Sequence, residues 1–418
     1  MRILSGFLLL AVFSALALCL ACVGGGGGSS APLPIAPTFT TQPESQTANS
    51  GSSASFTVAA NGIPAPTLTW QRSNDGGNTW TTISGATGTT YTFTTQLADT
   101  GAEFQATATN TVGTVVSNIA KLTVLNEIFV VNQAGTSGSI TAYAGNATGD
   151  AAPLISIAGT NADLSLPGGI ALATASNQIF VANFDNSSIT TYGMTETGNV
   201  SPQTTITGAS TGLDTPLGLA VDSVNGLVYA CNFNNRSITV YKFTDNGNVT
   251  PQKTISGTNT TLSNPAYLAL DLVNQHIFVT NDLTKAILVF NTTDTGNVTP
   301  QSIITGTNTG LNQPQGIAVD PATGKVFVAN YESNAILVFN TTDKGNVQPS
   351  ATISGTNTGL DSPFGLALDT VNNLLYVANA KGQSITIFNA TDNGNVSPIY
   401  TITGVSTELV NPTGIALQ

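Results

Sequence analysis

The most regular feature of the chain is an alternation of short apolar and polar runs that repeats from about residue 126 to residue 418. Each run has the length of a β-strand and is rich in β-branched and aromatic residues, and Gly, Asn and Asp lie in the turns between runs. Four such runs make one unit, as at residues 316–320, 326–330, 335–339 and 351–354. The pattern predicts four short strands per unit and an all-β fold.

Two series of residues give the spacing of this repeat. A tripeptide that begins with Gly in five of six copies recurs every 49 residues, at 169, 218, 267, 316, 365 and 414. A strand-ending asparagine recurs at 132, 183, 232, 281, 330 and 379. Four strands in about 49 residues are typical of a β-propeller blade and not of a solenoid. The repeat starts with a second strand and ends with a first strand, so pairing of these two would close a six-bladed ring without an open edge.

The repeating unit resembles the NHL-type six-bladed propellers of exported bacterial proteins. The resemblance rests on a Pro-x-Gly-Ile-Ala-Val-Asp strand at residues 314–320, followed by a Phe-Val-Ala-Asn strand at residues 327–330. It implies that the first strand of each blade lines a central channel. It also implies that ligands meet the face formed by the loops that precede the first strand and follow the second. No single function follows, because such propellers carry many.

The segment before the repeat has the short strands and turns of a β-sandwich. It resembles the immunoglobulin-like fold, of the I-set type, through a Gly-x-Pro-x-Pro segment at 62–66, Trp70, and an Asp-x-Gly-x-x-Phe segment at 99–104. The paired cysteines of that family correspond to Val58 and Ala106. The resemblance therefore implies a sandwich without the usual disulfide. We expect a spacer or adhesion module, with specific recognition by its loops as the alternative.

The N-terminus has the pattern of an export signal, with a positive start and an apolar run over residues 3–21. Its end, Leu20-Ala21-Cys22, resembles the bacterial lipoprotein signal, which implies lipidation of Cys22; Cys19 is the alternative, and a plain signal peptide or an uncleaved anchor stays open. A Gly/Ser/Pro-rich stretch follows and predicts a flexible tether. We expect a lipid-anchored protein of the bacterial cell envelope, at the outer membrane and facing the periplasm or the cell surface. The predicted organisation is signal peptide 1–22, tether 23–37, immunoglobulin-like sandwich 38–125 and six-bladed propeller 126–418.

Composition narrows the classes of function. Charged residues make up 8% of the chain and the net charge is −12, so no basic surface for nucleic acid is expected. The single histidine, His276, starts a second strand, toward the face opposite the expected ligand face, which excludes histidine-dependent acid-base catalysis, a catalytic triad and zinc sites built on several histidines. Cys231 lies in an apolar run and is expected to be a buried core residue. We expect no metal and no cofactor.

The strand-ending asparagines could ring the channel mouth and bind a cation or sugar hydroxyls, but a structural role in their loops is the favoured interpretation. Specificity is expected where the blades differ. Several of the differing side chains are aromatic and could form a platform, or they could simply pack on the neighbouring blade. The candidate ligand-binding residues are Phe184, Phe233, Arg236, Asp282, Tyr331, Glu332, Phe364 and Lys381.

The leading hypothesis is a non-catalytic binding or adhesion protein whose propeller recognises a carbohydrate, peptide or protein. The alternative is a hydrolase or lactonase of the propeller type with an atypical channel site. It is less favoured because the six positions that open the first strands carry neither a carboxylate nor a histidine. A purely structural surface component is a third possibility.

Overall fold

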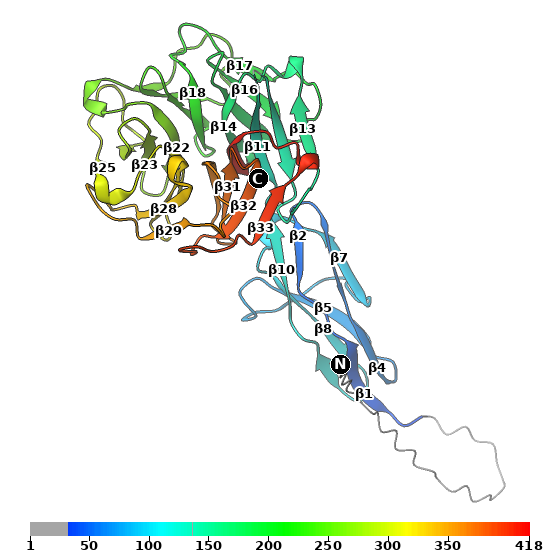
Figure 1. Cartoon of the computed structure of the whole chain (residues 1–418). Helices are drawn as coiled ribbons and strands as arrows, with labels where there is room; N and C mark the ends of the chain where they lie inside the picture. Colours follow the sequence, from blue (N-terminus) through cyan, green and yellow to red (C-terminus); the bar gives the residue numbers. More distant parts are fainter. Residues whose placement is uncertain (1–31, 136) are drawn as a thin grey trace, which may run out of the picture.

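The computed structural model describes residues 32–135 and 137–418. Over these residues the chain forms a sandwich domain that leads directly into a ring of four-stranded sheets (Figure 1). Helical structure in the described part consists of 3-10 turns of three residues each. The prediction of an all-β chain is confirmed. The residues predicted to form the signal peptide, including Cys19 and Cys22, lie outside the described residues.

The sandwich domain has ten strands. A six-stranded sheet contains β2, β10, β8, β5, β6 and β9, while β1 pairs with β4 and β3 pairs with β7. A 3-10 turn, η1 (Leu97–Asp99), precedes β8. The strands are β1 (Ile35–Thr41), β2 (Gln46–Asn49), β3 (Ser53–Thr57), β4 (Ala59–Ile63), β5 (Thr67–Ser73), β6 (Thr81–Thr82), β7 (Thr90–Thr94), β8 (Glu103–Thr109), β9 (Thr114–Val116) and β10 (Ala120–Leu125).

The core of this domain shows how it does without a disulfide. Val58 and Ala106 stand at the positions of the family cysteines and are buried. Phe56 and Phe104 stack in the same core with ring centroids 4.5 Å apart. The indole nitrogen of buried Trp70 donates a hydrogen bond to the carbonyl oxygen of Gly88 at 3.0 Å. Packed aromatic area thus takes the place of the covalent link.

The start of this domain corrects one predicted boundary. β1 begins at Ile35, inside the segment 23–37 that the sequence predicts to be a tether. Ile35 pairs with Ile63 of β4, and its carbonyl oxygen accepts a hydrogen bond from the side chain of Asn110 at 2.7 Å. The Ala/Pro-rich composition of this segment led to the prediction of a tether. A strand forms there nevertheless, because proline is tolerated on an edge strand.

The ring contains six four-stranded sheets in the described residues. In each sheet the first strand is innermost, and neighbouring first strands contact one another around the ring. Short 3-10 turns lie in the loops: η2 (Thr160–Ala162), η3 (Thr174–Ser176), η4 (Thr258–Thr260), η5 (Thr307–Thr309), η6 (Tyr331–Ser333) and η7 (Val405–Thr407). The strands, in order from the inside of each sheet, are β34 (Pro412–Leu417), β11 (Ile128–Ala134), β12 (Ser137–Tyr143) and β13 (Ile155–Ala158); β14 (Pro167–Ala173), β15 (Gln178–Asn183), β16 (Ser188–Gly193) and β17 (Thr204–Ile206); β18 (Pro216–Asp222), β19 (Leu227–Asn232), β20 (Ser237–Lys242) and β21 (Lys253–Ile255); β22 (Pro265–Asp271), β23 (His276–Asn281), β24 (Ala286–Asn291) and β25 (Ser302–Thr305); β26 (Pro314–Asp320), β27 (Lys325–Asn330), β28 (Ala335–Asn340) and β29 (Ala351–Ser354); β30 (Pro363–Asp369), β31 (Leu374–Asn379), β32 (Ser384–Asn389) and β33 (Tyr400–Thr403).

The ring closes through the C-terminal strand. β34 pairs antiparallel with β11, with Ile415 opposite Val130 and Leu417 opposite Ile128. Strands that lie about 290 residues apart in sequence therefore belong to one sheet. In Figure 1 the red end of the chain meets the cyan strand that begins the ring. This pairing occupies the edge that β11 would otherwise expose.

A second set of contacts joins neighbouring sheets at their outer strands. An asparagine in each long outer turn accepts a backbone N–H from the preceding sheet, as Asn199 does from Asn161 and Asn297 from Asn259, each at 2.7 Å. At the seam between the last and first sheets an aspartate does this, because Asp150 accepts the N–H of Ser406 at 2.6 Å. The outer rim is therefore linked all the way round.

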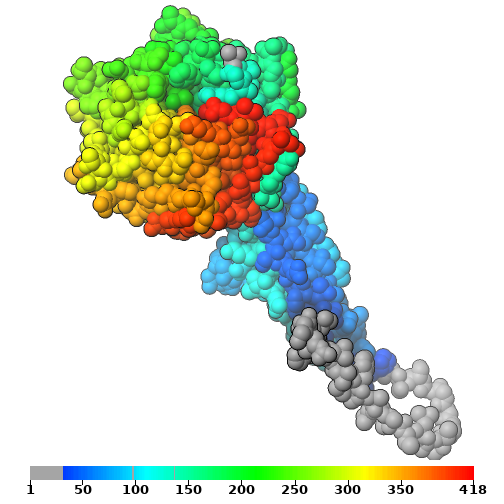
Figure 2. Space-filling view, viewed as in Figure 1, coloured from blue at the N-terminus to red at the C-terminus, as the bar shows by residue number. Residues whose placement is uncertain are grey.

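The sandwich domain is fixed to the ring at one face. The side chain of Asn126 donates a hydrogen bond to Asp369 at 2.9 Å, and that of Asn372 donates to the carbonyl oxygen of Val124 at 3.1 Å. Leu125 is buried in one core with Tyr376 of the ring. Figure 2 shows the sandwich domain extending from one side of the ring. These contacts lie where first strands end and second strands begin, so the face with the opposite strand ends is turned away from the sandwich domain.

Candidate functional site

A cavity of about 310 Å³ opens on the face of the ring that is turned away from the sandwich domain. Every one of its lining residues comes from a strand end or a loop on that face. The lining combines aromatic and aliphatic side chains with three amides and one carboxylate. The residues that line it are Gln133, Leu166, Phe184, Leu217, Phe233, Asp282, Gln313, Gln315, Tyr331 and Phe364.

Five of these residues occupy the same position in successive sheets. Gln133, Phe184, Phe233, Asp282 and Tyr331 each follow directly after the repeated asparagine of a second strand. Each donates its backbone N–H to the carbonyl oxygen of the residue before the proline that opens the first strand, at 3.1–3.2 Å. The backbone at this position is therefore fixed in the same way in each sheet, while the side chain is free to differ.

The strand-ending asparagines hold these loops. The side-chain oxygen of Asn281 accepts the backbone N–H of Ser263 at 2.7 Å, and that of Asn330 accepts the backbone N–H of Asn312 at 2.6 Å. Their side-chain nitrogens donate to Thr261 and Gly310 carbonyl oxygens at 3.0 and 2.9 Å. All six asparagines are buried. Because their polar atoms are engaged with the protein, they act in loop structure and do not present a ring of ligands.

Other lining residues come from the first strands. Leu217, Gln315 and Phe364 are the second residues of β18, β26 and β30. Leu166 and Gln313 come one residue before the opening proline and have left-handed backbones, with φ of 45° and 52°. That conformation is uncommon for a residue with a side chain.

Asp282 is the only carboxylate in the lining of this cavity, within the part of the chain that the structure describes. Burial beside apolar side chains raises the pKa of its carboxyl group above the ordinary value, and the charge of Lys285 acts in the opposite direction. The ammonium group of Lys285 itself contacts the side-chain oxygen of Asn312 at 2.8 Å. A carboxylate with a raised pKa is suited to proton transfer.

The three lining amides differ in how far they are already engaged. The side chain of Gln133 donates to the carbonyl oxygen of Pro167 at 3.2 Å and accepts from Asn411 at 3.0 Å. Gln315 is 6% exposed, and its buried side-chain oxygen has no hydrogen-bond partner among the described residues. An unpartnered buried polar atom is costly unless a ligand or water satisfies it. Gln315 therefore indicates a polar contact point on the inner wall.

The aromatic residues both line the cavity and pack on the core beneath it. The rings of Phe184 and Phe233 meet edge to face with centroids 6.1 Å apart, and Tyr331 meets Phe364 in the same way at 5.8 Å. Phe184, Phe233 and Phe364 also pack against the buried core of the ring. These residues therefore pack on the core and form part of the cavity wall at the same time, while their role as a ligand platform stays a prediction.

The structure divides the predicted ligand-binding residues into two groups. Five of them lie together around the cavity: Phe184, Phe233, Asp282, Tyr331 and Phe364. The others, Arg236, Glu332 and Lys381, are exposed and do not line it. Among them, the ammonium nitrogen of Lys381 lies 5.3 Å from the centroid of the Tyr331 ring. They lie further along the same loops, where the chain has already turned away from the ring axis.

The sequence analysis did not select Gln133, Leu166 or Gln313, and it treated Leu217 and Gln315 only as positions that open a strand. A usable signal exists in the repeat. The residue immediately before each opening proline differs between blades and has a positive φ in each. Comparing this column across the six units would have found Leu166 and Gln313.

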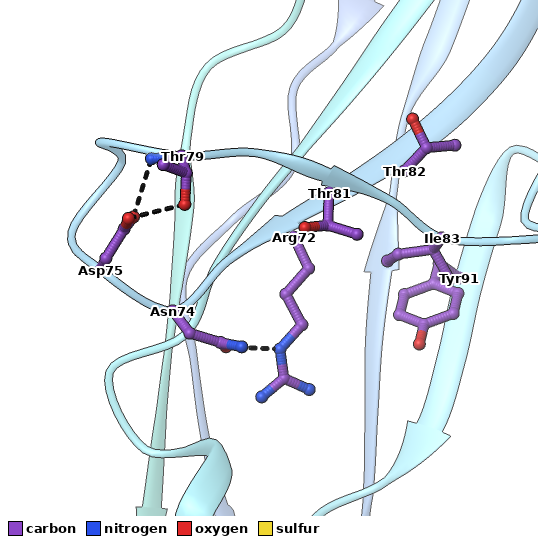
Figure 3. A pocket seen from close by; sticks show the side chains of 8 residues that line it. All are labelled: Arg72, Asn74, Asp75, Thr79, Thr81, Thr82, Ile83 and Tyr91. Carbon is purple, nitrogen blue, oxygen red and sulfur yellow. Dashed lines mark hydrogen bonds between the residues drawn. The ribbon is translucent and has the colours of Figure 1, made fainter.

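A second hollow lies in the sandwich domain and is lined by Arg72, Asp75, Thr79, Ile83, Tyr91 and neighbouring residues (Figure 3). Its charged groups are already paired. Asp75 accepts hydrogen bonds from the backbone and hydroxyl of Thr79 at 2.9 and 2.6 Å, which lower the pKa of its carboxyl group to about 2. The guanidinium of Arg72 contacts Asn74 and Asp99, each at 2.7 Å. These side chains are engaged in stabilising the sandwich domain. The ring cavity is therefore the better candidate site.

Among the described residues, no three His, Cys, Asp or Glu side chains come together in a way that could hold a metal ion. The single carboxylate of the cavity does not fit the several oxygen ligands that a hard cation requires. Cys231 is fully buried, and burial raises the pKa of its thiol, so it is unreactive where it lies. No helix among the described residues is long and apolar enough to span a membrane.

The fold and the cavity define a class of protein, a β-propeller with an N-terminal immunoglobulin-like domain and a ligand-sized cavity at the ring centre. Residues 36–110 match the family described as an immunoglobulin domain. Residues 79–410 match the family described as lactonase, 7-bladed β-propeller, and the chain belongs to this family. The prediction of an immunoglobulin-like domain followed by a propeller is confirmed. The predicted number of blades, six, differs from the seven in the family's description, while the described residues form six four-stranded sheets.

Individual proteins similar to the chain cover different shares of it. Endoglucanase C of Cellulomonas fimi is 42% identical over 102 residues, which are 24% of this chain and 9% of that protein, so the chain spans about a tenth of its length. A 6-phosphogluconolactonase structure described as putative, from Bacteroides uniformis, is 12% identical, with a TM-score of 0.47 and coverage of 85% of this chain and 100% of that one. The periplasmic gluconolactonase of Pseudomonas aeruginosa is 12% identical, with a TM-score of 0.47 and coverage of 84% and 98%.

Membership of the lactonase family contradicts the predicted function. The leading hypothesis from the sequence, a non-catalytic binding or adhesion protein, is wrong, and the hydrolase alternative is favoured. The error came from looking for a cluster of acids or histidines in the first strands. The carboxylate that lines the cavity, Asp282, instead follows a second strand and is a single residue.

Proposed function

We propose that the protein is a hydrolase that opens the ring of a small, uncharged lactone in the cavity around Asp282. Membership of the lactonase family supports the reaction class. The observation that carries the assignment to this cavity is the half-buried Asp282, whose pKa is raised by burial among aromatic and aliphatic side chains. A carboxylate in such surroundings is a suitable general base near neutral pH.

The reaction follows from the groups that line the cavity. Asp282 takes a proton from a water molecule, and the resulting hydroxide forms a bond to the carbonyl carbon of the lactone. The side-chain amide of Gln315 or Gln313 donates a hydrogen bond to the oxygen that becomes negatively charged. The tetrahedral intermediate collapses by breaking the ring C–O bond, and the proton held by Asp282 passes to the departing alkoxide. The net change is the addition of one water and formation of a hydroxy acid, which then ionises.

The residues that line the cavity also bear on the charge of the substrate. Among the described residues that line the cavity there is no Lys, Arg or His. A phosphorylated or carboxylated lactone would bring a negative charge close to Asp282 without a cation to bind it. The aromatic faces of Phe184, Phe233 and Tyr331 suit the C–H faces of a neutral ring. We therefore propose an uncharged lactone, with or without hydroxyl groups.

The test is acid release from neutral lactones, measured at constant pH by titration with base. Asp282→Asn is expected to lower kcat/KM by at least about 100-fold, the usual lower limit for loss of a general base. Glu332→Gln is the matched control, because Glu332 is an exposed carboxylate on the same face, and it is expected to retain wild-type activity. If no neutral lactone is hydrolysed, or if Asp282→Asn is as active as wild type, the proposal is wrong.

The cellular location of the protein is a separate proposal. We propose that the chain is lipidated at Cys22 and attached to a membrane of the bacterial envelope, with the outer membrane favoured. The N-terminal apolar run and the Leu20-Ala21-Cys22 sequence support it. The sandwich domain would then serve as a spacer, and the cavity would face away from the membrane because it lies on the far face of the ring. Metabolic labelling with a fatty-acid analogue should be lost in Cys22→Ser and retained in Cys19→Ser.

The blade number is part of the same proposal. We propose that the ring is a six-bladed member of its family, with blades that keep the NHL-like Pro-x-Gly-Ile-Ala-Val-Asp strand. The six four-stranded sheets and the pairing of β34 with β11 support this count.

A further inference from the structure

One position of the first strands is glycine in every blade but one. The residue that starts the repeated tripeptide is Gly169, Gly218, Gly316, Gly365 or Gly414 in five of the first strands. These glycines allow close packing of the strands: a Cβ at Gly169 would lie 2.3 Å from the carbonyl oxygen of Leu217, and one at Gly316 would lie 2.3 Å from that of Phe364. In β22 the corresponding residue is Tyr267.

Tyr267 crosses the centre of the ring. Its hydroxyl lies 2.6 Å from the carbonyl oxygen of Gly168 in β14 and 3.0 Å from that of Thr413 in β34. Around the ring, β22 is three first strands away from β34 in either direction, so the two lie on opposite sides of the axis. The side chain is 7% exposed, and burial raises the pKa of its hydroxyl, which therefore stays protonated and able to donate.

The structure around Tyr267 is adapted to it and connects it to the cavity. Thr280 accepts the backbone N–H of Tyr267 at 3.0 Å and donates to the carbonyl oxygen of Gln315 at 2.6 Å. The other blades have Val, Ala or Cys at the position of Thr280. The Tyr267 ring also meets that of Phe364 edge to face, with centroids 5.8 Å apart, and packs in the core cluster that contains Leu217. Phe364, Gln315 and Leu217 all line the cavity, so Tyr267 packs against residues of the lining without being a lining residue itself.

We propose that Tyr267 is the residue that closes the central channel under the cavity and so sets the size of ligand that the protein accepts. With the tyrosine in place, the cavity is blind and excludes a long substituent from the channel. With glycine there, as in the other five blades, the cavity would extend into the channel and accept a chain along the axis. Tyr267 is thus a specificity-determining residue of the site; the role rests on the cavity being the ligand site described under the proposed function.

The experiment compares wild type, Tyr267→Gly and Tyr267→Phe with two series of ring compounds that carry linear alkyl chains from methyl to octyl. Six-membered lactones report hydrolysis, and the matching lactams, which resist hydrolysis, report binding by calorimetry. We expect wild type to favour the methyl compounds in both series. Tyr267→Gly should bind the octyl lactam at least about tenfold more tightly than wild type, since a few more buried methylene groups suffice for that factor.

Tyr267→Phe keeps the ring and removes the hydroxyl, so it is expected to retain the wild-type preference for short chains. If Tyr267→Gly does not fold, Tyr267→Leu replaces it, because leucine keeps apolar packing but is too short to reach the opposite strands. An unchanged chain-length preference in the folded glycine or leucine variant would overturn the inference.

The lactam series separates this inference from the proposed function. If lactones are not hydrolysed but Tyr267→Gly gains affinity for long lactams, the proposed reaction is wrong and the role of Tyr267 stands. If lactones are hydrolysed and the chain-length preference is unchanged, the role of Tyr267 is wrong and the reaction stands. Absence of lactam binding to every variant would contradict both the cavity as ligand site and the role of Tyr267.

Discussion

The blade that contains Tyr267 and the blade that follows it share a framework and differ at the ring centre. In both, a buried asparagine, Asn281 or Asn330, ends the second strand and holds the preceding loop through the same hydrogen bonds. In both, an aspartate in the outer turn, Asp294 or Asp343, accepts a backbone N–H at 2.8 Å. Two of the differences between these blades lie near the axis.

Both of these positions bear on the site. Where the following blade has Gly316, this blade has Tyr267, which reaches the opposite side of the ring. Where the following blade has Tyr331, this blade has Asp282, the one carboxylate in the cavity lining among the described residues. The comparison teaches that residues repeated in all blades account for folding and ring closure. Residues near the axis that depart from the repeat are the better candidates for ligand binding and catalysis.

The largest expected effect comes from opening the ring, which tests whether the blades form one cooperative unit. Deleting residues 412–418 removes β34, leaves β11 with an open edge and exposes the core around Ile415. We expect the melting temperature to fall by more than about 10 °C, because several kcal/mol of packing and hydrogen bonding are lost. Differential scanning calorimetry measures this. Deletion of exposed Gln418 alone is the control, and a deleted chain that melts with the full-length protein would contradict the closed ring.

A smaller effect is expected from replacing the repeated asparagine in each of the two blades, which separates a role in folding from a role in catalysis. Asn281→Ala and Asn330→Ala each leave a half-buried backbone N–H, that of Ser263 or Asn312, without its partner, which costs about 1–3 kcal/mol. We expect both to lower the melting temperature by a similar amount, about 3–8 °C. Asn281→Ala should also lower kcat/KM strongly, by about tenfold or more and by more than Asn330→Ala, since Asn281 directly precedes Asp282 and its side chain donates to Thr284 in the same loop.

The outcome that would contradict this account is an equal loss of activity in the two asparagine variants, or a clear difference in their stability. Asp294→Ala serves as the control within the same blade. Asp294 lies in the exposed outer turn, where loss of its hydrogen bond should change stability by less than about 1 kcal/mol and leave activity unchanged.

Much of the architecture could be predicted because it rests on local, repeated signals. The alternation of apolar residues predicts the strands, and the 49-residue period predicts the ring and its closure by the last strand. The residue after each strand-ending asparagine was also predictable, and Phe184, Phe233, Asp282 and Tyr331 do share one cavity. These positions follow from the blade itself, and every blade places them on the same face.

The rest depends on contacts across the ring. Tyr267 appears in the sequence only as an irregular member of a glycine series, and its role emerges when its hydroxyl meets Gly168 and Thr413 from distant blades. The raised pKa of Asp282 likewise depends on burial by residues of other blades. The sequence hypothesis of a non-catalytic protein was wrong because it required a cluster of titratable groups and did not consider a single carboxylate in apolar surroundings.

The most direct test of the central claim, that Asp282 is the base of a lactone-opening site, is the pH profile of kcat/KM for a neutral lactone. Because the pKa of Asp282 is raised and the base is active only when deprotonated, kcat/KM should be low in acid. It should rise with pH through a midpoint above the value of about 4 expected for an exposed aspartate, and then level off. Asp282→Asn should lose this acidic limb together with most of the activity. An acidic limb that persists unchanged in Asp282→Asn would contradict the claim.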